Sequence, residues 1–145
     1  MKTFKYILIV VAVLALIGGW YGYREYNRKP TDLVDAKVDV EVTSVELCAQ
    51  FTNDEKLATS MYVGITPKEK VLAVKGKITS IDKDDKGLYS VLLGTDVDMS
   101  SVSCQMDLAH NMEATQLKVG EDIVMKGICT GFLSDVVLIR CVIQK

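Results

Sequence analysis

The sequence is poor in the residues from which most metal and acid–base sites are built. It has one histidine, His110, and its four cysteines form no Cys-x-x-Cys pair. Structural zinc sites take four cysteine or histidine ligands at such spacings, so no zinc site is expected. A lone histidine without a nucleophile motif is most simply interpreted as a surface residue. The sequence also lacks a phosphate-binding glycine loop, and it therefore predicts no catalytic residue, metal or cofactor: the protein is not expected to be an enzyme.

Residues 82–93 resemble a calcium-binding loop only in part. Asp82, Asp84 and Gly87 match its first, third and sixth positions. Lys86 and Leu93 stand at the fifth and twelfth positions, where oxygen ligands are required. Residues 84–87 are therefore predicted to form a solvated hairpin turn.

Positive charge is scarce beyond the N-terminal region. Residues 1–30 hold five of the 17 basic residues and one of the 19 acidic residues, which leaves 12 basic and 18 acidic residues and a net charge of −6. Proteins that bind nucleic acid non-specifically draw most of their affinity from Lys and Arg on phosphates. The acidic balance disfavours that class of ligand, although it leaves room for a local basic groove.

One long apolar run stands at the N-terminus. Tyr6 to Tyr23 contains no charged residue, and as a helix its 18 residues span roughly 27 Å, close to the hydrocarbon thickness of a bilayer. Trp20, Tyr21 and Tyr23 gather at its end, where aromatic rings favour the headgroup region. Residues 6–23 are therefore predicted to insert into a membrane, within an N-terminal transmembrane helix of residues 1–24.

The fate and orientation of this segment depend on its flanks. A cleaved signal peptide and a retained anchor begin alike, but no Ala-x-Ala pattern ends the run, which favours a retained signal-anchor. Basic residues are nearly balanced on its two sides, so the positive-inside rule does not decide. The likeness to a secretion signal favours a single-pass protein with its soluble domain outside the cytoplasm, in the periplasm or cell envelope.

The soluble part begins with a linker and a helical segment. Residues 25–41 are polar around Pro30 and are predicted as a linker, whose last part alternates in the manner of a short extended segment. Thr43 and Glu46 have the spacing of a capping box, and Asn53 can cap a second turn. We expect a helix or helix pair over residues 44–62.

From residue 70 the periodicity changes to two, with β-branched residues and turn signals between the runs. The predicted strands cover residues 71–81, 88–93, 102–106, 121–130 and 136–143. Gly76 lies inside the first strand and indicates a bulge or a sharp bend. Residues 109–117 form a short helical connection between the third and fourth strands. This order predicts a mainly β (α+β) domain over residues 42–145, a five-stranded OB-type Greek-key barrel with a leading helix.

One set of positions in this domain matches a known family: Phe51, Asn53, Glu55, Ala58 and Tyr62, then residues 70–76, 102–104, 119–131 and 136–141. At these positions the sequence resembles the tRNA_anti-like OB-fold family of small membrane-anchored or lipoprotein-like proteins. The resemblance implies an OB barrel that serves as a binding module, with nucleic-acid or oligosaccharide binding by analogy of fold. The chain departs from a lipoprotein pattern because no lipid-accepting cysteine follows the apolar run.

The cysteines leave two interpretations open. The third and fifth strands of an OB barrel are neighbours, so Cys104 can lie near Cys141, and Cys129 near either of them. A disulfide is possible in an oxidising compartment. Buried thiols, with Cys48 as the fourth, explain the pattern equally well.

Candidate ligand-binding residues are the basic side chains on predicted strands and one aromatic ring. They are Lys75, Lys77, Tyr89, Lys126 and Arg140. We expect a non-enzymatic, membrane-anchored binding module for a protein, saccharide or polyanionic partner. The alternative is a nucleic-acid-binding OB protein for single strands or tRNA, in which Lys75, Lys77, Lys126 and Arg140 line a basic groove and Tyr89 is a stacking ring.

Overall fold

The structure of the chain, a computed structural model, describes residues 2–27, 32–64, 68–94 and 100–145. It divides into two compact units, Met1–Thr31 and Asp32–Lys145. The first unit contains one helix, α1 (Lys2–Tyr26), in which Phe4–Tyr26 is long and apolar enough to cross a membrane. A signal sequence satisfies the same criterion. The expected apolar N-terminal helix is thus confirmed.

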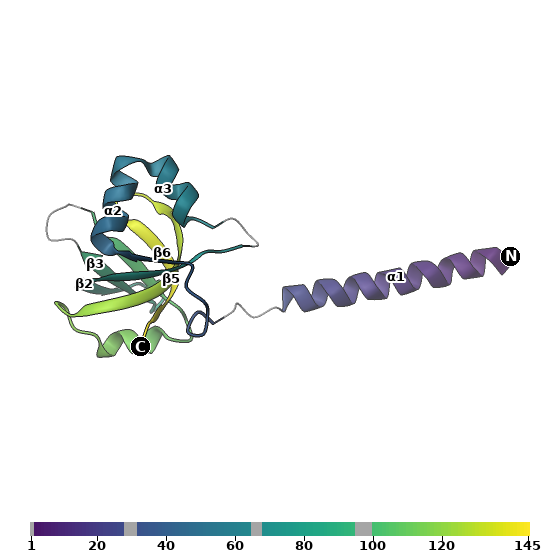
Figure 1. Cartoon of the computed structure of the whole chain (residues 1–145). Helices are drawn as coiled ribbons and strands as arrows, with labels where there is room; N and C mark the ends of the chain where they lie inside the picture. The colour runs from purple at the N-terminus through teal and green to yellow at the C-terminus, as the bar shows by residue number, and fades with distance from the viewer. Residues whose placement is uncertain (1, 28–31, 65–67, 95–99) are drawn as a thin grey trace. The chain divides into compact units, whose positions relative to one another are not determined.

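The second unit is a closed β-barrel (Figure 1). Its strands are β1 (Val40–Thr43), β2 (Val71–Lys83), β3 (Tyr89–Gly94), β4 (Val102–Met106), β5 (Asp122–Phe132) and β6 (Val136–Ile143). Neighbours follow the order β1-β2-β3-β4-β6-β5, and β5 also pairs with β2, which closes the barrel. The predicted five-stranded OB-type barrel is confirmed, and β1 is a short strand added to it.

Strand β2 pairs with a different neighbouring strand along each half of its length. Its residues 71–77 pair with β5 and residues 77–83 pair with β3, so the change of partner falls next to Gly76. The register shift lies between Ile78 and Ser80, and therefore the bulge suggested for Gly76 occurs beyond it. A Cβ at position 76 would lie 2.6 Å from the Ser44 Oγ atom. Glycine is required there because α2 approaches the strand closely.

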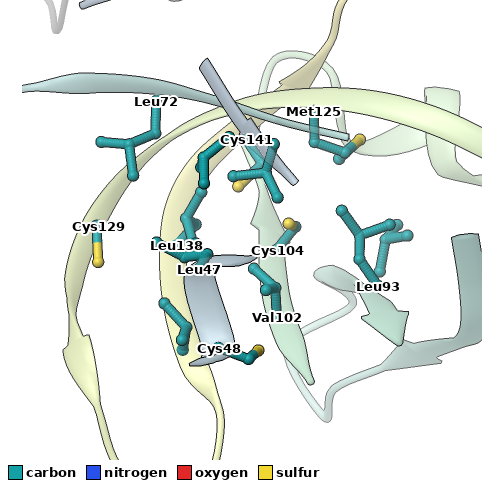
Figure 2. Packing of buried hydrophobic residues seen from close by; sticks show 14 of the residues in the cluster. Leu47, Cys48, Leu72, Leu93, Val102, Cys104, Met125, Cys129, Leu138 and Cys141 are labelled. Carbon is teal, nitrogen blue, oxygen red and sulfur yellow. The ribbon is translucent and has the colours of Figure 1, made fainter. Parts of the chain in front are cut away.

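The period-two pattern directs alternate side chains into the barrel. In β4, Val102, Cys104 and Met106 are buried, whereas Ser103 and Gln105 between them are half-buried. The other strands contribute buried side chains to the same core, among them Leu72, Leu93, Met125 and Leu138 (Figure 2). Burial of apolar area of this kind is the main favourable contribution to folding.

Helices close the two ends of the barrel (Figure 1). One end carries α2 (Ser44–Asn53) and α3 (Glu55–Tyr62), and the other carries the 3₁₀ helix η1 (Asn111–Gln116). Thr43 caps α2 as expected, because its Oγ1 atom accepts a hydrogen bond from the Glu46 N–H at 3.2 Å. Asp54, rather than the expected Asn53, caps α3 through its Oδ1 atom, which accepts from the Leu57 N–H at 3.0 Å.

Residues 32–39, which we call the strap, contact the outer face of the barrel ahead of β1. Leu33 is 4% exposed and packs with Val71, Ile128 and Val142. The Asp39 N–H donates to the Val71 carbonyl oxygen at 2.9 Å, and the Val71 N–H donates to the Asp39 Oδ2 atom at 2.9 Å. The linker expected over residues 25–41 therefore includes a segment that packs on the barrel.

All four cysteines are buried, and in the described structure none forms a disulfide. Cys104 on β4 and Cys141 on β6 both lie in the core (Figure 2). Burial, together with a hydrogen bond to Cys104, raises the pKa of Cys141 well above its usual value. Burial also raises the pKa of Cys129 to about 11. The apolar interior therefore favours the neutral form of the Cys129 and Cys141 thiols.

Candidate ligand-binding surfaces

OB barrels bind ligands over the outer face of their second and third strands, which here are β3 and β4. Ser90 lies opposite Gln105, and Leu92 lies opposite Ser103. Val91 and Leu93 point into the core, so their neighbours in β3 point outward. With the paired residues of β2, the outer side chains are Ser80, Asp82, Ser90, Leu92, Ser103 and Gln105. We call this surface the β3–β4 face.

The β3–β4 face is polar and carries little charge. Its six side chains comprise three hydroxyls, one amide, one leucine and one carboxylate, and none of the six is basic or aromatic. Ser80 donates a hydrogen bond to the Asp82 Oδ2 atom at 2.7 Å. Proteins that bind single strands combine a positive groove with aromatic rings on which bases stack. The six side chains of the β3–β4 face have neither of these features.

Tyr89, the predicted stacking ring, begins β3 but packs against the barrel core. The Lys83 Nζ atom lies 5.3 Å from the centre of its ring. The Tyr89 N–H donates to the Asn111 Oδ1 atom at 2.7 Å, which joins β3 to η1. The ring is half-buried, and these contacts hold it in place as part of the barrel end.

Lys75 and Lys77 are exposed on the outer face of β2. Lys77 lies opposite Asp122 of β5, so a cation and an anion face each other across the pair. Lys75 borders a groove of about 340 Å³. The groove is lined by Glu41, Val42, Thr43, Glu46, Ala73, Lys75, Val124 and Gln144. Two carboxylates accompany the single cation, which makes the groove a poor site for a polyanion.

Lys126 points outward from β5 beneath the strap. Its Nζ atom donates hydrogen bonds to the carbonyl oxygen of Val34 at 3.0 Å and to that of Ala36 at 3.4 Å. The ammonium group thus holds the strap and is occupied by backbone oxygens.

Arg140 stands at an irregular point of β6, where its φ angle is 54°. The register of β6 against both β4 and β5 shifts at this position, so Arg140 forms a bulge. Its Nη1 atom lies 3.3 Å from the Glu69 Oε2 atom, and its Nε atom lies 3.9 Å from the Asp107 Oδ2 atom. The guanidinium is engaged with carboxylates of the domain itself.

The five sequence-predicted residues therefore do not form one groove. Lys75, Lys77 and Lys126 share the outer face of the β2–β5 pair, because Lys75 and Lys77 lie opposite Val124 and Asp122, and Lys126 lies opposite Ala73. Tyr89 and Arg140 belong to other strands and make their own internal contacts.

The sequence matches the family model tRNA_anti-like over residues 1–143. The chain belongs to the tRNA_anti-like family. No curated protein matches it. The family assignment agrees with the resemblance seen in the sequence and with the closed barrel.

Comparison with solved structures supports the fold of this tRNA_anti-like chain. A "putative nucleic acid-binding lipoprotein" from Klebsiella pneumoniae subsp. pneumoniae is 19% identical, with a TM-score of 0.59 over 81% of this chain and 100% of that chain. The Stn1-Ten1 complex of S. pombe is 22% identical over 55% of this chain and 62% of that chain, with a TM-score of 0.40. At these identities the first likeness shows the fold alone, and the second is too weak to add to it.

The tRNA_anti-like barrel also brings together a cluster that the sequence did not indicate. His110 was expected to be a simple surface residue, but its Nδ1 atom lies 2.7 Å from the Glu113 Oε1 atom and its Nε2 atom lies 3.1 Å from the Asp32 Oδ2 atom. Hydrogen bonds to Glu113 and then Asp32 raise the pKa of His110. A backbone hydrogen bond from Val34, and the contact with His110, lower the pKa of Asp32.

The spacing of His110 and Glu113 was a possible signal for half of this cluster, because three residues span one turn of a 3₁₀ helix. Asp32 is 78 residues away in the sequence, and only the folded chain brings it to the imidazole. Among the residues that the structure describes, this cluster included, no group of three His, Cys, Asp or Glu side chains is arranged to hold a metal ion.

Proposed function

We infer that this protein is a membrane-anchored, non-enzymatic OB-fold module that binds a segment of a partner protein through the β3–β4 face, outside the cytoplasm. The observation that supports this proposal is the chemistry of that face. Hydroxyl, amide and leucine side chains dominate it, and its one charged group is the carboxylate of Asp82.

Protein partners suit such a surface better than nucleic acid. Hydroxyls and amides can both donate and accept hydrogen bonds, as the backbone of a partner requires. A phosphate backbone would meet the Asp82 carboxylate and a unit, residues 32–145, of net charge −6. Lys126 and Arg140, which would have to neutralise phosphates, already contact groups of the domain.

Membrane anchoring is supported by α1. Phe4–Tyr26 is an apolar helix of 23 residues, and Trp20, Tyr21 and Tyr23 lie near its C-terminal end. A module held at the membrane in this way meets its partner in a thin layer, where even a weak contact is favoured by high local concentration.

Site-specific photo-crosslinking tests the proposal with the full chain in cells. A photoreactive amino acid placed at Leu92 samples the β3–β4 face, and one placed at Thr59, exposed on α3, is the matched control. Leu92 is expected to form discrete protein adducts that Thr59 does not form. Adducts with nucleic acid, or identical adducts from both positions, contradict the proposal.

Nucleic-acid binding is the second candidate, and the exposed Lys75 and Lys77 are the observation in its favour. It predicts that the full chain in lipid nanodiscs retains a fluorescent single strand at low salt, and that Lys75→Glu with Lys77→Glu abolishes retention. We expect no salt-dependent retention in fluorescence anisotropy. Retention that is lost in the double variant would replace the first proposal with this one.

The extracytoplasmic location is tested by protease added to intact cells whose outer barrier, if present, has been permeabilised. Digestion of the barrel before lysis is the expected result. Protection until lysis would place the barrel in the cytoplasm and would favour the nucleic-acid alternative.

A further inference from the structure

We propose that the strap is a releasable part of the tether, which detaches from the barrel when the contact between Asp32 and His110 is lost and so lengthens the connection between α1 and the barrel. Three sets of contacts hold the strap, and they differ in chemistry. An ion pair lies at its first residue, an apolar side chain and a lysine hold its middle, and a ladder of hydrogen bonds continues from its end into β1.

The ion pair is the contact nearest to α1 along the chain. Asp32 reaches His110 at 3.1 Å, and its other carboxylate oxygen accepts a hydrogen bond from the Val34 N–H at 3.0 Å. Glu113 lies on the opposite side of the imidazole at 2.7 Å. His110 is thus held between two carboxylates, of which one belongs to η1 and the other to the strap.

The middle of the strap is held by packing and by one cation. Leu33 is buried against Val71, Ile128 and Val142, outside the main core. Lys126 binds the carbonyl oxygens of Val34 and Ala36. This satellite cluster has far fewer buried residues than the main core, so the polar contacts at its edge contribute a larger share of what keeps it closed.

The charged groups around His110 set the conditions for release. Asp32 and Glu113 contact it directly, and Lys126 and Lys145 line the same cavity of about 270 Å³ together with Val34. The two carboxylates raise the pKa of His110 through their hydrogen bonds, Glu113 more than Asp32, and burial opposes them. Asp32 is affected in the opposite sense, since its pKa is lowered from 3.8.

The direction of the pH effect follows from these shifts. Protonated His110 stabilises the docked strap through its contact with Asp32, and this contribution is lost as the pH rises through the raised pKa of His110. The larger part of the shift comes from Glu113 of η1, so it remains when the strap is released. Ionised Asp32 contributes to the stability of the docked strap above pH 3.8, and this contribution is lost as the pH falls through the lowered pKa of Asp32. The strap is therefore docked between the two pKa values and is released on the alkaline side of the upper one.

Release of the strap lengthens the tether between α1 and the barrel by an amount set by the number of released residues. Residues 32–38 are seven residues, and an extended chain spans about 3.4 Å per residue, so their release adds up to about 24 Å to the tether. Asp39 stays paired with Val71 at the start of β1, which marks the natural end of the releasable segment.

Hydrogen exchange on the full chain in lipid nanodiscs tests the proposal. Strap amides within the releasable segment, such as those of Val34 and Ala36, are compared with the Val91 amide of the core over a pH series, with correction for the intrinsic exchange rate. His110 is the only histidine of the chain, so its NMR titration is unambiguous in the same sample. The variants are His110→Gln and Glu113→Gln, and the matched control is Asp85→Asn in the exposed β2–β3 turn.

Several-fold loss of strap protection is expected as His110 deprotonates, with no change at Val91. His110→Gln should show low strap protection at every pH, Glu113→Gln should shift the loss to lower pH together with the His110 titration, and Asp85→Asn should behave as the unmodified chain. Strap protection that does not follow the His110 titration overturns the proposal. So does loss of protection at Val91 in parallel with the strap, because it would show that the strap opens only when the barrel unfolds.

Discussion

The Ser44 hydroxyl donates a hydrogen bond to the Gly94 carbonyl oxygen at 3.1 Å and so joins the first residue of α2 to the end of β3. Both β1 and β3 pair with β2 near this point, since Thr43 lies opposite Lys75 and Gly94 lies opposite Lys77. Ser44 is 2% exposed and is the buried polar residue of the described core. It bridges the point where the added strand and the barrel meet.

Replacing Ser44 by alanine should lower the free energy of unfolding by about 1 kcal/mol, because the Gly94 carbonyl loses its buried partner. The measurement is thermal unfolding of the full chain in detergent, followed by circular dichroism in the β-sheet region. Ser60→Ala on the exposed surface of α3 is the control and should change stability little. Equal effects of the two substitutions would show that the Ser44 bridge contributes nothing.

Gly76→Ala should destabilise the barrel by about 1 to 3 kcal/mol, because the new Cβ would lie 2.6 Å from Ser44 Oγ and 3.1 Å from Leu93 Cβ. A double-mutant cycle checks the cause. Ser44→Gly removes the nearest colliding atoms, so the double variant should be more stable than the sum of the two single effects predicts. If the effects of the two substitutions on stability simply add, the cost of Gly76→Ala does not come from contact with the Ser44 side chain.

Phe51→Ala should cost about 3 to 5 kcal/mol, since the ring is 1% exposed and its loss leaves a cavity at the end of the barrel. Its ring stacks on Phe132 with centroids 5.8 Å apart, and it also meets Tyr62 at 6.1 Å. Leu57→Ala on the same helical cap is the comparison, because Leu57 is 57% exposed and should change stability by no more than about 0.5 kcal/mol. Chemical denaturation curves of the two variants measure both quantities, and similar midpoints would refute the proposed packing role of α2.

Arg140→Gly should be more stable than Arg140→Ala by about 0.5 to 1 kcal/mol. Both substitutions remove the contacts with Glu69 and Asp107, but glycine adopts the positive φ of 54° without the strain that alanine meets there. Differential scanning calorimetry measures the thermal stability of the two variants, and the difference between them reports the backbone strain at position 140 alone. Alanine equal to or better than glycine would mean that the bulge relaxes when the arginine is removed.

A thiol reagent at pH 8 should label none of the four cysteines in the native chain, because all are buried and the pKa of Cys129 is raised to about 11. Intact-mass measurement after treatment in detergent, with and without denaturant, counts the accessible thiols. Labelling of all four in denaturant without reduction would show that no disulfide forms in cells. Rapid labelling of Cys129 without denaturant would contradict its burial in β5.

Local pattern was sufficient for the elements and for their order. Alternation in Val102–Met106 predicted which side chains of β4 enter the core, and the Thr43–Glu46 spacing predicted the start of α2. The same reasoning could not predict the contacts of the basic side chains, because exposure on a strand does not show which distant group a long side chain will reach. Lys126 and Arg140 were expected in a groove, and instead they bind the strap and two carboxylates.

The sequence by itself determined the apolar N-terminal helix, the period-two strands and the acidic balance of the domain, since each depends on neighbouring residues or on composition. Tertiary structure alone decided that the six outer side chains of the β3–β4 face include no basic and no aromatic one. It also decided that Leu33, in the expected linker, packs on the barrel. Finally, it brought Asp32 into contact with His110, which is 78 residues away in the sequence. The physical reason is barrel closure. Pairing β2 with β5 sets which strands are neighbours and which side chains share a face, and no local periodicity contains that information.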